Sequence, residues 1–211
     1  MDYAAFLPRF GGAYRTKNLN SPMEVRWRQT KRNARGYFLT PSKALPAEFI
    51  RLDPWVGEYL FMLAARARRG ILEIGRFNGG SAFLMACAND TVPIRSIDIA
   101  PQDDARLLAL LAEHGLGGRL ALEVADSRSC ALPEPGSIDL LFIDGDHSLE
   151  GCLADLRRFA PCLAPGGHLL LHDFYHGSPV MDAVHAFLAS GGPVLQTAWL
   201  IGREHWLVPT G

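Results

Sequence analysis

Short apolar runs that alternate with helical patterns from residue 70 onward constrain the fold of this chain more than any other feature. The runs occupy residues 71–75, 93–99, 119–125, 138–144 and 167–172. Each has the length and composition of a buried strand. Helical patterns occupy residues 79–89, 102–114 and 149–163 between them. Strands that alternate with helices form right-handed βαβ units, so we expect an α/β, Rossmann-like, doubly wound and mostly parallel sheet.

Segments on both sides of this alternation complete the expected architecture. A helix is predicted at 54–69 and another at 179–189, whereas 126–137 is rich in Ser and Pro and is predicted to be a loop. Residues 193–208 resemble two antiparallel strands joined in a tight hairpin, which brings the expected total to seven strands. We divide the chain into an N-terminal extension, 1–50, that covers the substrate site, and a cofactor-binding domain, 51–211.

Composition and charge exclude several classes of protein. Apolar residues make up 48% and charged residues 20% of the 211 residues, which is typical of a globular domain. Residues 1–50 carry nine Lys/Arg and three Asp/Glu, whereas 51–211 carry twelve and nineteen, so a basic arm precedes an acidic body. An acidic body without a recognised binding module argues against nucleic acid as a partner. No apolar run approaches the ~20 residues of a membrane span, and the first residues lack a basic segment before an apolar one, so we expect neither a membrane span nor a secretory signal.

Four cysteines lie in apolar segments without C-x-x-C pairing: Cys87, Cys130, Cys152 and Cys162. This pattern predicts reduced thiols in the core of a cytoplasmic protein.

The glycine-rich segment after the first predicted strand is the first candidate ligand site. In an open α/β sheet, ligands bind beyond the carboxyl ends of the strands. There the chain reads Glu73-Ile-Gly75-Arg-Phe-Asn78-Gly79-Gly80-Ser81. The spacing differs from the dinucleotide fingerprint, and no Gly-Lys-Ser/Thr follows, so NAD and nucleoside triphosphates lose support. Glu73 stands where it would meet a cationic group of a ligand, although a turn of this kind also serves packing alone.

Acidic residues at the next two strand ends extend this candidate site. Asp98 lies 23 residues beyond Gly75, where a carboxylate can accept both hydroxyls of a ribose. Asp126 and Ser127 end the third strand, where an acceptor could bind an adenine amino group. Asp126 taken alone is also compatible with an Asx turn. Three acids at successive strand ends beside one glycine loop are better explained together as a nucleoside site.

Carboxylates and imidazoles gather at the ends of the fourth and fifth strands. Asp144 and His147 follow the fourth strand, and His172 and Asp173 follow the fifth. Carboxylate oxygens suit Mg²⁺, Mn²⁺ or Ca²⁺, and added imidazole admits softer metals. Asp146 is better explained as a cap of the helix that begins near Ser148.

Together these residues resemble the class I S-adenosylmethionine-dependent methyltransferases, over roughly two thirds of the chain from Gly70 onward. The stretch 138–147, with Leu163-Ala-Pro-Gly-Gly167 and His172-Asp173, is similar to the small metal-dependent O-methyltransferases. These include catechol O-methyltransferase, the macrolide-sugar O-methyltransferases and the cephalosporin hydroxylase-like group. The resemblance implies transfer of a methyl group from S-adenosylmethionine to a hydroxyl oxygen of a small molecule, assisted by a divalent metal, Mg²⁺ by preference.

The resemblance also implies a role for each matching residue. The methionine end of the cofactor would be held by Glu73, Gly75, Asn78, Gly79, Gly80 and Ser81. Asp98 would bind the ribose, and Asp126 with Ser127 the adenine. Asp144 and Asp173 would be metal ligands, and His147 stands where relatives carry a proposed general base.

One departure affects the metal site. Relatives often carry a second acidic or amide residue beside the position of Asp173, where this chain has His172 and Phe174. His172 is therefore the candidate third ligand.

Two rival functions come from other classes. A metal-dependent oxygenase would use the carboxylates and imidazoles as an iron site but would leave the glycine loop without a role. A catalytically silent cofactor-binding module would leave the metal cluster without a role. The acceptor stays open among a catechol, a sugar hydroxyl and a polyketide hydroxyl, and the aromatic residues of the N-terminal arm suggest a homo-oligomer.

Overall fold

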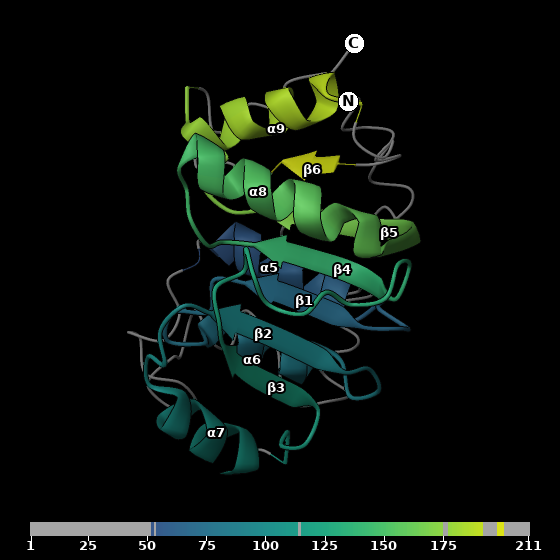
Figure 1. The fold of residues 1–211 in the computed structure, drawn as a ribbon. Helices are drawn as coiled ribbons and strands as arrows, with labels where there is room; N and C mark the ends of the chain where they lie inside the picture. The colour runs from purple at the N-terminus through teal and green to yellow at the C-terminus, as the bar shows by residue number, and fades with distance from the viewer. Residues whose placement is uncertain (1–51, 53, 114, 175–176, 192–197, 201–211) are drawn as a thin grey trace.

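A six-stranded parallel sheet organises the protein, as a computed structural model shows (Figure 1). The structure describes residues 52, 54–113, 115–174, 177–191 and 198–200. The strands are β1 (Ile71–Ile74), β2 (Ile94–Asp98), β3 (Leu120–Val124), β4 (Ile138–Ile143), β5 (Leu163–Leu171) and β6 (Ala198–Leu200). Their order is β3-β2-β1-β4-β5-β6. Strands β2 and β3 therefore lie on one side of β1 and the later strands on the other, and such a switch in strand order leaves a crevice at the carboxyl ends of β1 and β4.

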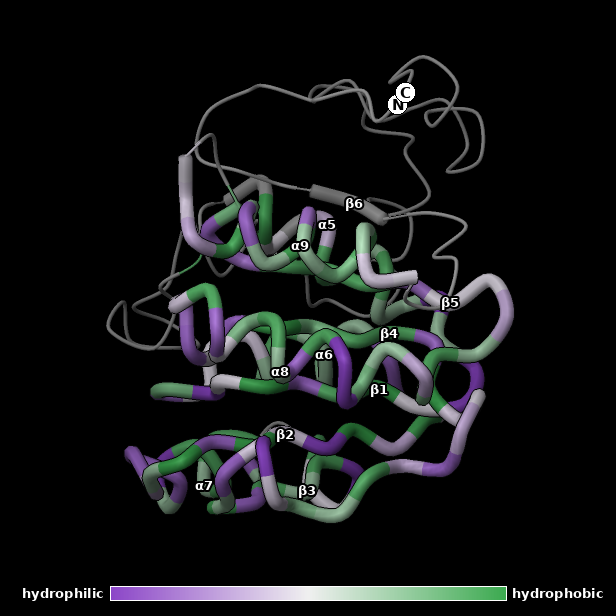
Figure 2. The backbone as a smooth tube through the Cα atoms, turned by 45° about the horizontal axis from the view of Figure 1, so that its top comes forward, coloured by the Kyte–Doolittle hydropathy of each residue, from purple (hydrophilic) through white to green (hydrophobic). Residues whose placement is uncertain are grey.

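Helices cover both faces of the sheet, and each face has its own apolar core (Figures 1 and 2). The helices are α5 (Pro54–Ala64), α6 (Gly80–Ala88), α7 (Asp104–Glu113), α8 (Leu149–Phe159) and α9 (Pro179–Ala189). One core joins α5, α6 and α7 to one side of the strands, and the other joins α8 and α9 to the opposite side. Alternate residues of β1 show the division, because Ile71 belongs to the first core and Leu72 to the second.

The five predicted strands and the helices between them are confirmed, with shifted ends. The first helix ends at Ala64 rather than near residue 69. Asn89 Nδ2 donates to the carbonyls of Ala64 and Ala67, and Asp139 accepts from the next two backbone N–H groups, so polar side chains replace the helical hydrogen bonds there. The loop at 126–137 is confirmed.

The helical pattern predicted at 149–163 extends too far. Helix α8 ends at Phe159, a short 3₁₀ turn follows, and β5 begins at Leu163 rather than 167. Pro161 has no N–H to continue an α-helix, which accounts for the early end. The buried stripe of α8 includes Cys152 and Asp155, whereas Leu153 is only partly buried.

Other predictions are tested only in part. All four cysteines are free and buried, as expected. The final described strand, β6, runs parallel to β5. The remainder of the predicted hairpin, the seventh strand and the N-terminal extension at 1–50 lie outside the described residues. No helix among the described residues is long and apolar enough to cross a membrane.

A candidate cofactor pocket beside a carboxylate–imidazole cluster

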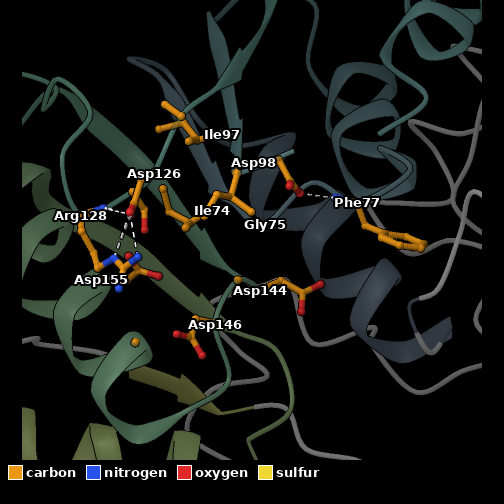
Figure 3. A pocket seen from close by; sticks show the side chains of 15 residues that line it. Ile74, Gly75, Phe77, Ile97, Asp98, Asp126, Arg128, Asp144, Asp146 and Asp155 are labelled. Atoms are coloured by element: carbon orange, nitrogen blue, oxygen red, sulfur yellow. Dashed lines mark hydrogen bonds and ion pairs between the residues drawn. The ribbon is translucent and has the colours of Figure 1, made fainter. Parts of the chain in front are cut away.

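A cavity of about 350 Å³ opens at the carboxyl ends of β1 to β4 (Figure 3). Its lining comes from residues 74, 75 and 77, from the segments 97–99 and 125–128, from the loop 144–146, and from Gly151 and Asp155 of α8. Predicted site residues from four separate strands therefore meet around one space, among them Gly75, Asp98, Asp126 and Asp144.

The glycine loop forms one wall of the cavity, and two of its glycines are required sterically. Gly75 has φ +87°, and a Cβ atom there would lie 2.1 Å from the carbonyl oxygen of Asp144. Gly79, the residue before α6, has φ +83°, and a Cβ atom there would lie 2.2 Å from a methyl carbon of Leu107. Only glycine combines such φ values with such close approach. The loop can therefore pass directly beside the strand that carries Asp144.

Three backbone N–H groups donate to the carboxylate of Asp98 and fix its orientation at the cavity. Its Oδ2 accepts from the N–H groups of Arg76 at 2.9 Å and Phe77 at 2.7 Å, and its Oδ1 accepts from Ala100 at 3.0 Å. The bond to Phe77 also supports an unusual backbone conformation, because that residue has φ +47° without being glycine. The carboxylate keeps lone pairs that can accept ribose hydroxyls.

Arg76 anchors the glycine loop from beneath, a role that the sequence did not indicate. Its guanidinium is fully buried and binds Asp104 through two hydrogen bonds of 2.7 and 2.9 Å. It also donates to the carbonyls of Ser96 and Glu123. A cation in a glycine loop suggests a ligand contact, but this one connects β2, β3 and α7 to the loop.

Glu73 lies under the loop rather than on the cavity surface. The residue is fully buried, and its two carboxylate oxygens accept hydrogen bonds from the hydroxyls of Ser81 and Ser96. Burial raises the pKa of Glu73 to about 7, with the two serine hydrogen bonds opposing the rise. Among the described residues it does not line the cavity, so any effect on the cofactor passes through Ser81 and the loop.

The raised pKa of Glu73 predicts a pH-dependent cost to stability. Between pH 4.5 and about 7 the folded protein binds more protons at this carboxyl than the unfolded chain does, so stability falls as the pH rises through that range. The loss is on the order of 3 kcal/mol once the group is ionised. We expect Glu73→Gln to raise the free energy of unfolding at pH 8, by up to this amount, and to leave it nearly unchanged at pH 4.5. Urea unfolding across pH measures the difference.

A matched control is Glu113→Gln at the exposed end of α7. That variant should shift the unfolding free energy by less than about 0.5 kcal/mol at either pH. An equal response of the two variants would rule out the buried-carboxyl explanation.

Asp126 faces the cavity but is already paired. Arg128 Nη2 and Nε lie 2.8 and 3.0 Å from its two carboxylate oxygens (Figure 3). The side-chain hydrogen bond from Arg128 lowers the pKa of Asp126 to about 2, so this group is an acceptor at every physiological pH. Arg128, two residues after the predicted adenine-binding acid, was not anticipated from the sequence.

Asp144 connects the cavity to a cluster of imidazoles and carboxylates. Its Oδ1 lies 3.1 Å from His147 Nε2 and 3.1 Å from His172 Nδ1. The nitrogen His147 Nδ1 lies 3.6 Å from Asp173 Oδ2. The hydrogen bond with Asp144 raises the pKa of His147, and the same two imidazoles, against the effect of burial, lower the pKa of Asp144. The structure thus brings together all four residues predicted to form the metal and catalytic site.

The cluster fits a divalent metal by its donor set. Potential ligand atoms of Asp144, His147 and His172 all lie within 4.8 Å of one another. The buried Nδ1 of His172 has two carboxylate oxygens within 3.4 Å but no well-directed hydrogen bond, which suits a nitrogen aimed at an ion. Asp173 has φ +51°, a strained conformation of the kind that functional sites retain. An imidazole beside carboxylates admits Mn²⁺ or a softer transition ion as well as Mg²⁺.

The sheet order, the glycine loop after β1 and the acid that ends β2 define the class I methyltransferase fold. Comparison with known proteins agrees, because residues 72–174 match the family described as a methyltransferase domain. Over these residues, about half of the chain, the protein is therefore similar to the methyltransferase domains, in agreement with the resemblance that the sequence indicated.

Individual relatives are similar over part of the chain or in fold alone. The 27-O-demethylrifamycin SV methyltransferase of Amycolatopsis mediterranei is 32% identical over 114 residues, which cover 54% of this chain and 41% of that protein. The chain spans about half the length of the curated relatives it matches. A crystal structure from Corynebacterium glutamicum has a TM-score of 0.58 at 19% identity, covering 78% of this chain and 85% of that one. Cofactor-bound Rv0187 from MTB has a TM-score of 0.54 at 21% identity, covering 80% and 84%.

Proposed function

We propose that the protein transfers a methyl group from S-adenosylmethionine to a hydroxyl oxygen of a small molecule, with a divalent metal bound beside the acceptor. One observation carries the proposal. Asp144 belongs both to the wall of the cofactor-sized cavity and to the carboxylate–imidazole cluster. A group that reacts with a ligand in the cavity would therefore be positioned by the cluster next to it.

Different residues around the cavity bind the ribose, the adenine and the methionine part of the cofactor. Asp98 binds the ribose hydroxyls, because its orientation is fixed by backbone N–H groups. Asp126 and Ser127 bind the adenine, and Arg128 must then yield part of its pairing with Asp126. The methionine end lies along the loop that contains Asn78, Gly79, Gly80 and Ser81.

Methyl transfer is an in-line displacement, so the protein must align the acceptor oxygen with the methyl group and hold the proton that leaves. Bound S-adenosylmethionine supplies an electrophilic methyl group on a sulfonium. When Nε2 of His147 carries the hydrogen shared with Asp144 Oδ1, its Nδ1 is free to accept the hydroxyl proton. The neighbouring Asp173 stabilises the imidazolium that results.

A divalent ion bound by Asp144, Asp173 and His172 would lower the pKa of an acceptor hydroxyl and fix its position. Aliphatic and phenolic hydroxyls are mostly protonated at neutral pH, so this assistance complements the base. The name of the rifamycin relative supports a hydroxyl acceptor. Catechol, sugar and polyketide hydroxyls are all compatible with this chemistry.

Replacing Asp98 with Ala should severely weaken the binding of S-adenosylhomocysteine, the demethylated product. The variant loses the ribose acceptor and also the bonds that hold Arg76 and Phe77 of the loop. We expect an increase in Kd of at least about 100-fold, or roughly 3 kcal/mol, by titration calorimetry. NAD should not bind the wild-type protein. An unchanged Kd in the variant would exclude Asp98 as the ribose residue.

Removing divalent metal should abolish methyl transfer while cofactor binding persists, because among the described residues the cavity and the cluster have only Asp144 in common. Activity should return with Mn²⁺ or Mg²⁺ after chelation, and calorimetry should show Mn²⁺ binding that Asp173→Ala weakens. The assay measures tritiated methyl groups transferred to a panel of catechols, sugars and macrocyclic alcohols. Full turnover in excess chelator would contradict the metal's role and leave His147 as the principal activator.

The cluster also favours a second candidate, a metal-dependent oxygenase. His147, His172 and Asp144 provide the two imidazoles and one carboxylate typical of non-haem iron sites. Iron-dependent oxygen consumption that does not require S-adenosylmethionine would support this function. The glycine loop and Asp98 favour the methyltransferase.

A further inference from the structure

The carboxylate of Asp98 depends on a series of contacts that begins behind the cavity wall, at Asp104 in α7. Asp98 accepts from the backbone N–H groups of Arg76 and Phe77, the second of which is drawn in Figure 3. The side chain of the same Arg76 donates to Asp104 through Nε at 2.9 Å and Nη2 at 2.7 Å. Neither Arg76 nor Asp104 belongs to the described residues that line the cavity. The ion pair therefore lies behind the wall that carries the ribose acceptor.

The guanidinium of Arg76 is fixed from several sides. It is fully buried, and Nη1 donates to the carbonyls of Ser96 in β2 at 2.8 Å and Glu123 in β3 at 3.2 Å. Among the described residues, only Asp104 forms an ion pair with it. A buried cation that loses its partner is costly, so without the charge of Asp104 the guanidinium must shift or admit water. Either change disturbs the backbone N–H of Arg76 that Asp98 uses.

Helix α7 contacts the glycine loop at a second point, one turn further along. A Cβ atom at Gly79 would lie 2.2 Å from a methyl carbon of Leu107, which is fully buried. Asp104 and Leu107 are three residues apart and therefore lie on one face of the helix. Helix α7 thus contacts both ends of the segment 76–79, and none of its residues, all of which are described, lines the cavity.

The orientation of Asp98 decides how well it accepts a ribose hydroxyl, because hydrogen bonds weaken steeply as they depart from linearity. Its Oδ2 already accepts from the two loop N–H groups, and its Oδ1 accepts from Ala100. These donors therefore fix the directions of the lone pairs that remain for a ligand. A shift of the loop would turn the carboxylate and weaken its hydrogen bonds to the ribose.

We propose that Asp104 is a positioning residue for the cofactor. Its ion pair with Arg76 holds the loop N–H groups that orient Asp98, and so it sets the affinity for the ribose hydroxyls from outside the cavity. This inference rests on the proposed function, because it requires S-adenosylmethionine to occupy the cavity with its ribose at Asp98. It extends the site to α7, a helix that has no contact of its own with the cavity.

The test compares S-adenosylhomocysteine with its 2′,3′-dideoxy analogue, which lacks both ribose hydroxyls. Titration calorimetry on the full chain gives the Kd of each ligand. The wild type should bind the analogue at least about tenfold more weakly, or 1.4 kcal/mol. Asp104→Asn removes the charge at nearly constant size. It should bind S-adenosylhomocysteine about tenfold more weakly and the analogue nearly as the wild type does, so the ratio of the two Kd values should fall by about tenfold.

Asp103→Asn is the matched control. Asp103 is the neighbouring acid at the start of α7, but its side chain is half exposed and lies 3.8 Å from Arg106 in a surface ion pair. Such pairs contribute little, so this variant should keep the wild-type ratio.

A purely structural role of Asp104 predicts a different pattern. If Asp104→Asn weakens both ligands by the same factor, or weakens neither, the inference is overturned. If that variant does not fold, Arg76→Lys decides. Lysine keeps the cation but not the planar fork that bonds Asp104 twice, so an undiminished ratio in that variant would also overturn the inference.

The wild type separates this inference from the proposed function. No binding of S-adenosylhomocysteine to the wild type would reject both. Binding without discrimination against the dideoxy analogue would overturn the inference together with the ribose assignment of Asp98. Wild-type discrimination that Asp98→Ala removes and Asp104→Asn leaves intact would reject the inference alone.

Discussion

His147→Ala is expected to lower kcat for methyl transfer by about 10²–10⁴-fold, the usual contribution of a general base. The side chain lies three residues after Asp144, and its ring contacts that carboxylate at 3.1 Å while Nδ1 points toward Asp173. Without the imidazole, the hydroxyl proton loses its acceptor, since His172 is the proposed metal ligand and a carboxylate such as Asp144 is a weaker base than an imidazole.

Binding measurements separate the possible roles of His147. Affinity for S-adenosylhomocysteine should stay nearly unchanged, because His147 does not line the cavity among the described residues. His185→Ala, on the exposed side of α9, is the matched control and should keep full activity. A fall in kcat of less than tenfold would be under 1.4 kcal/mol of barrier and would reject the base role. A parallel loss of Mn²⁺ affinity would identify His147 as a metal ligand instead.

The pH dependence of kcat gives a second readout of the same residue. The hydrogen bond with Asp144 raises the pKa of His147 above its ordinary value near 6.5, so a larger fraction of the base is protonated at neutral pH. Activity that needs the neutral imidazole should therefore rise with pH through a value above 6.5, and this acidic limb should be absent from the residual activity of His147→Ala.

The sheet and the residues at its carboxyl edge could be predicted because a simple rule connects them. Buried parallel strands are recognisable as short apolar runs, and their ends must meet at one edge. Asp98, Asp126 and Asp144 lie at or directly after the ends of three such runs, and the structure brings them around one cavity. No knowledge of side-chain contacts was needed to group them.

The side-chain directions at that edge could not be predicted in the same way. Glu73 precedes the glycine loop and was expected to meet a ligand, but it points into the core between two serines. Arg76 is buried and Arg128 pairs with Asp126, and both arrangements depend on how loops fold over the strands. The buried position of Asp155 beside the cavity could have been noticed in the sequence, because this acid lies between Leu153 and Leu156 on a helix with a buried face.

Gly75 is the point at which the glycine loop touches the backbone that follows β4, so Gly75→Ala should have the largest structural effect. The new Cβ atom would lie 2.1 Å from the carbonyl oxygen of Asp144 and 2.6 Å from the nitrogen of Gly145. Neither backbone can retreat freely, because the N–H of Gly75 donates to Ile97 at 2.9 Å and the N–H of Asp144 donates to Ile74 at 2.8 Å. Relief of the clash must break hydrogen bonds that extend the central ladders of the sheet.

We expect Gly75→Ala to lower the free energy of unfolding by more than about 4 kcal/mol, among the largest effects of single substitutions. Gly136→Ala is the matched control, since that loop glycine also has positive φ, +72°, but a Cβ atom there would meet nothing within 4 Å. It should cost only the conformational strain of about 1–2 kcal/mol. Urea unfolding of both variants measures the difference, and equal losses would mean that the contact with Asp144 contributes nothing. Because Asp144 belongs to both the cavity and the metal cluster, any Gly75→Ala protein that folds should lose affinity for S-adenosylhomocysteine and for Mn²⁺ together, whereas Gly136→Ala should keep both.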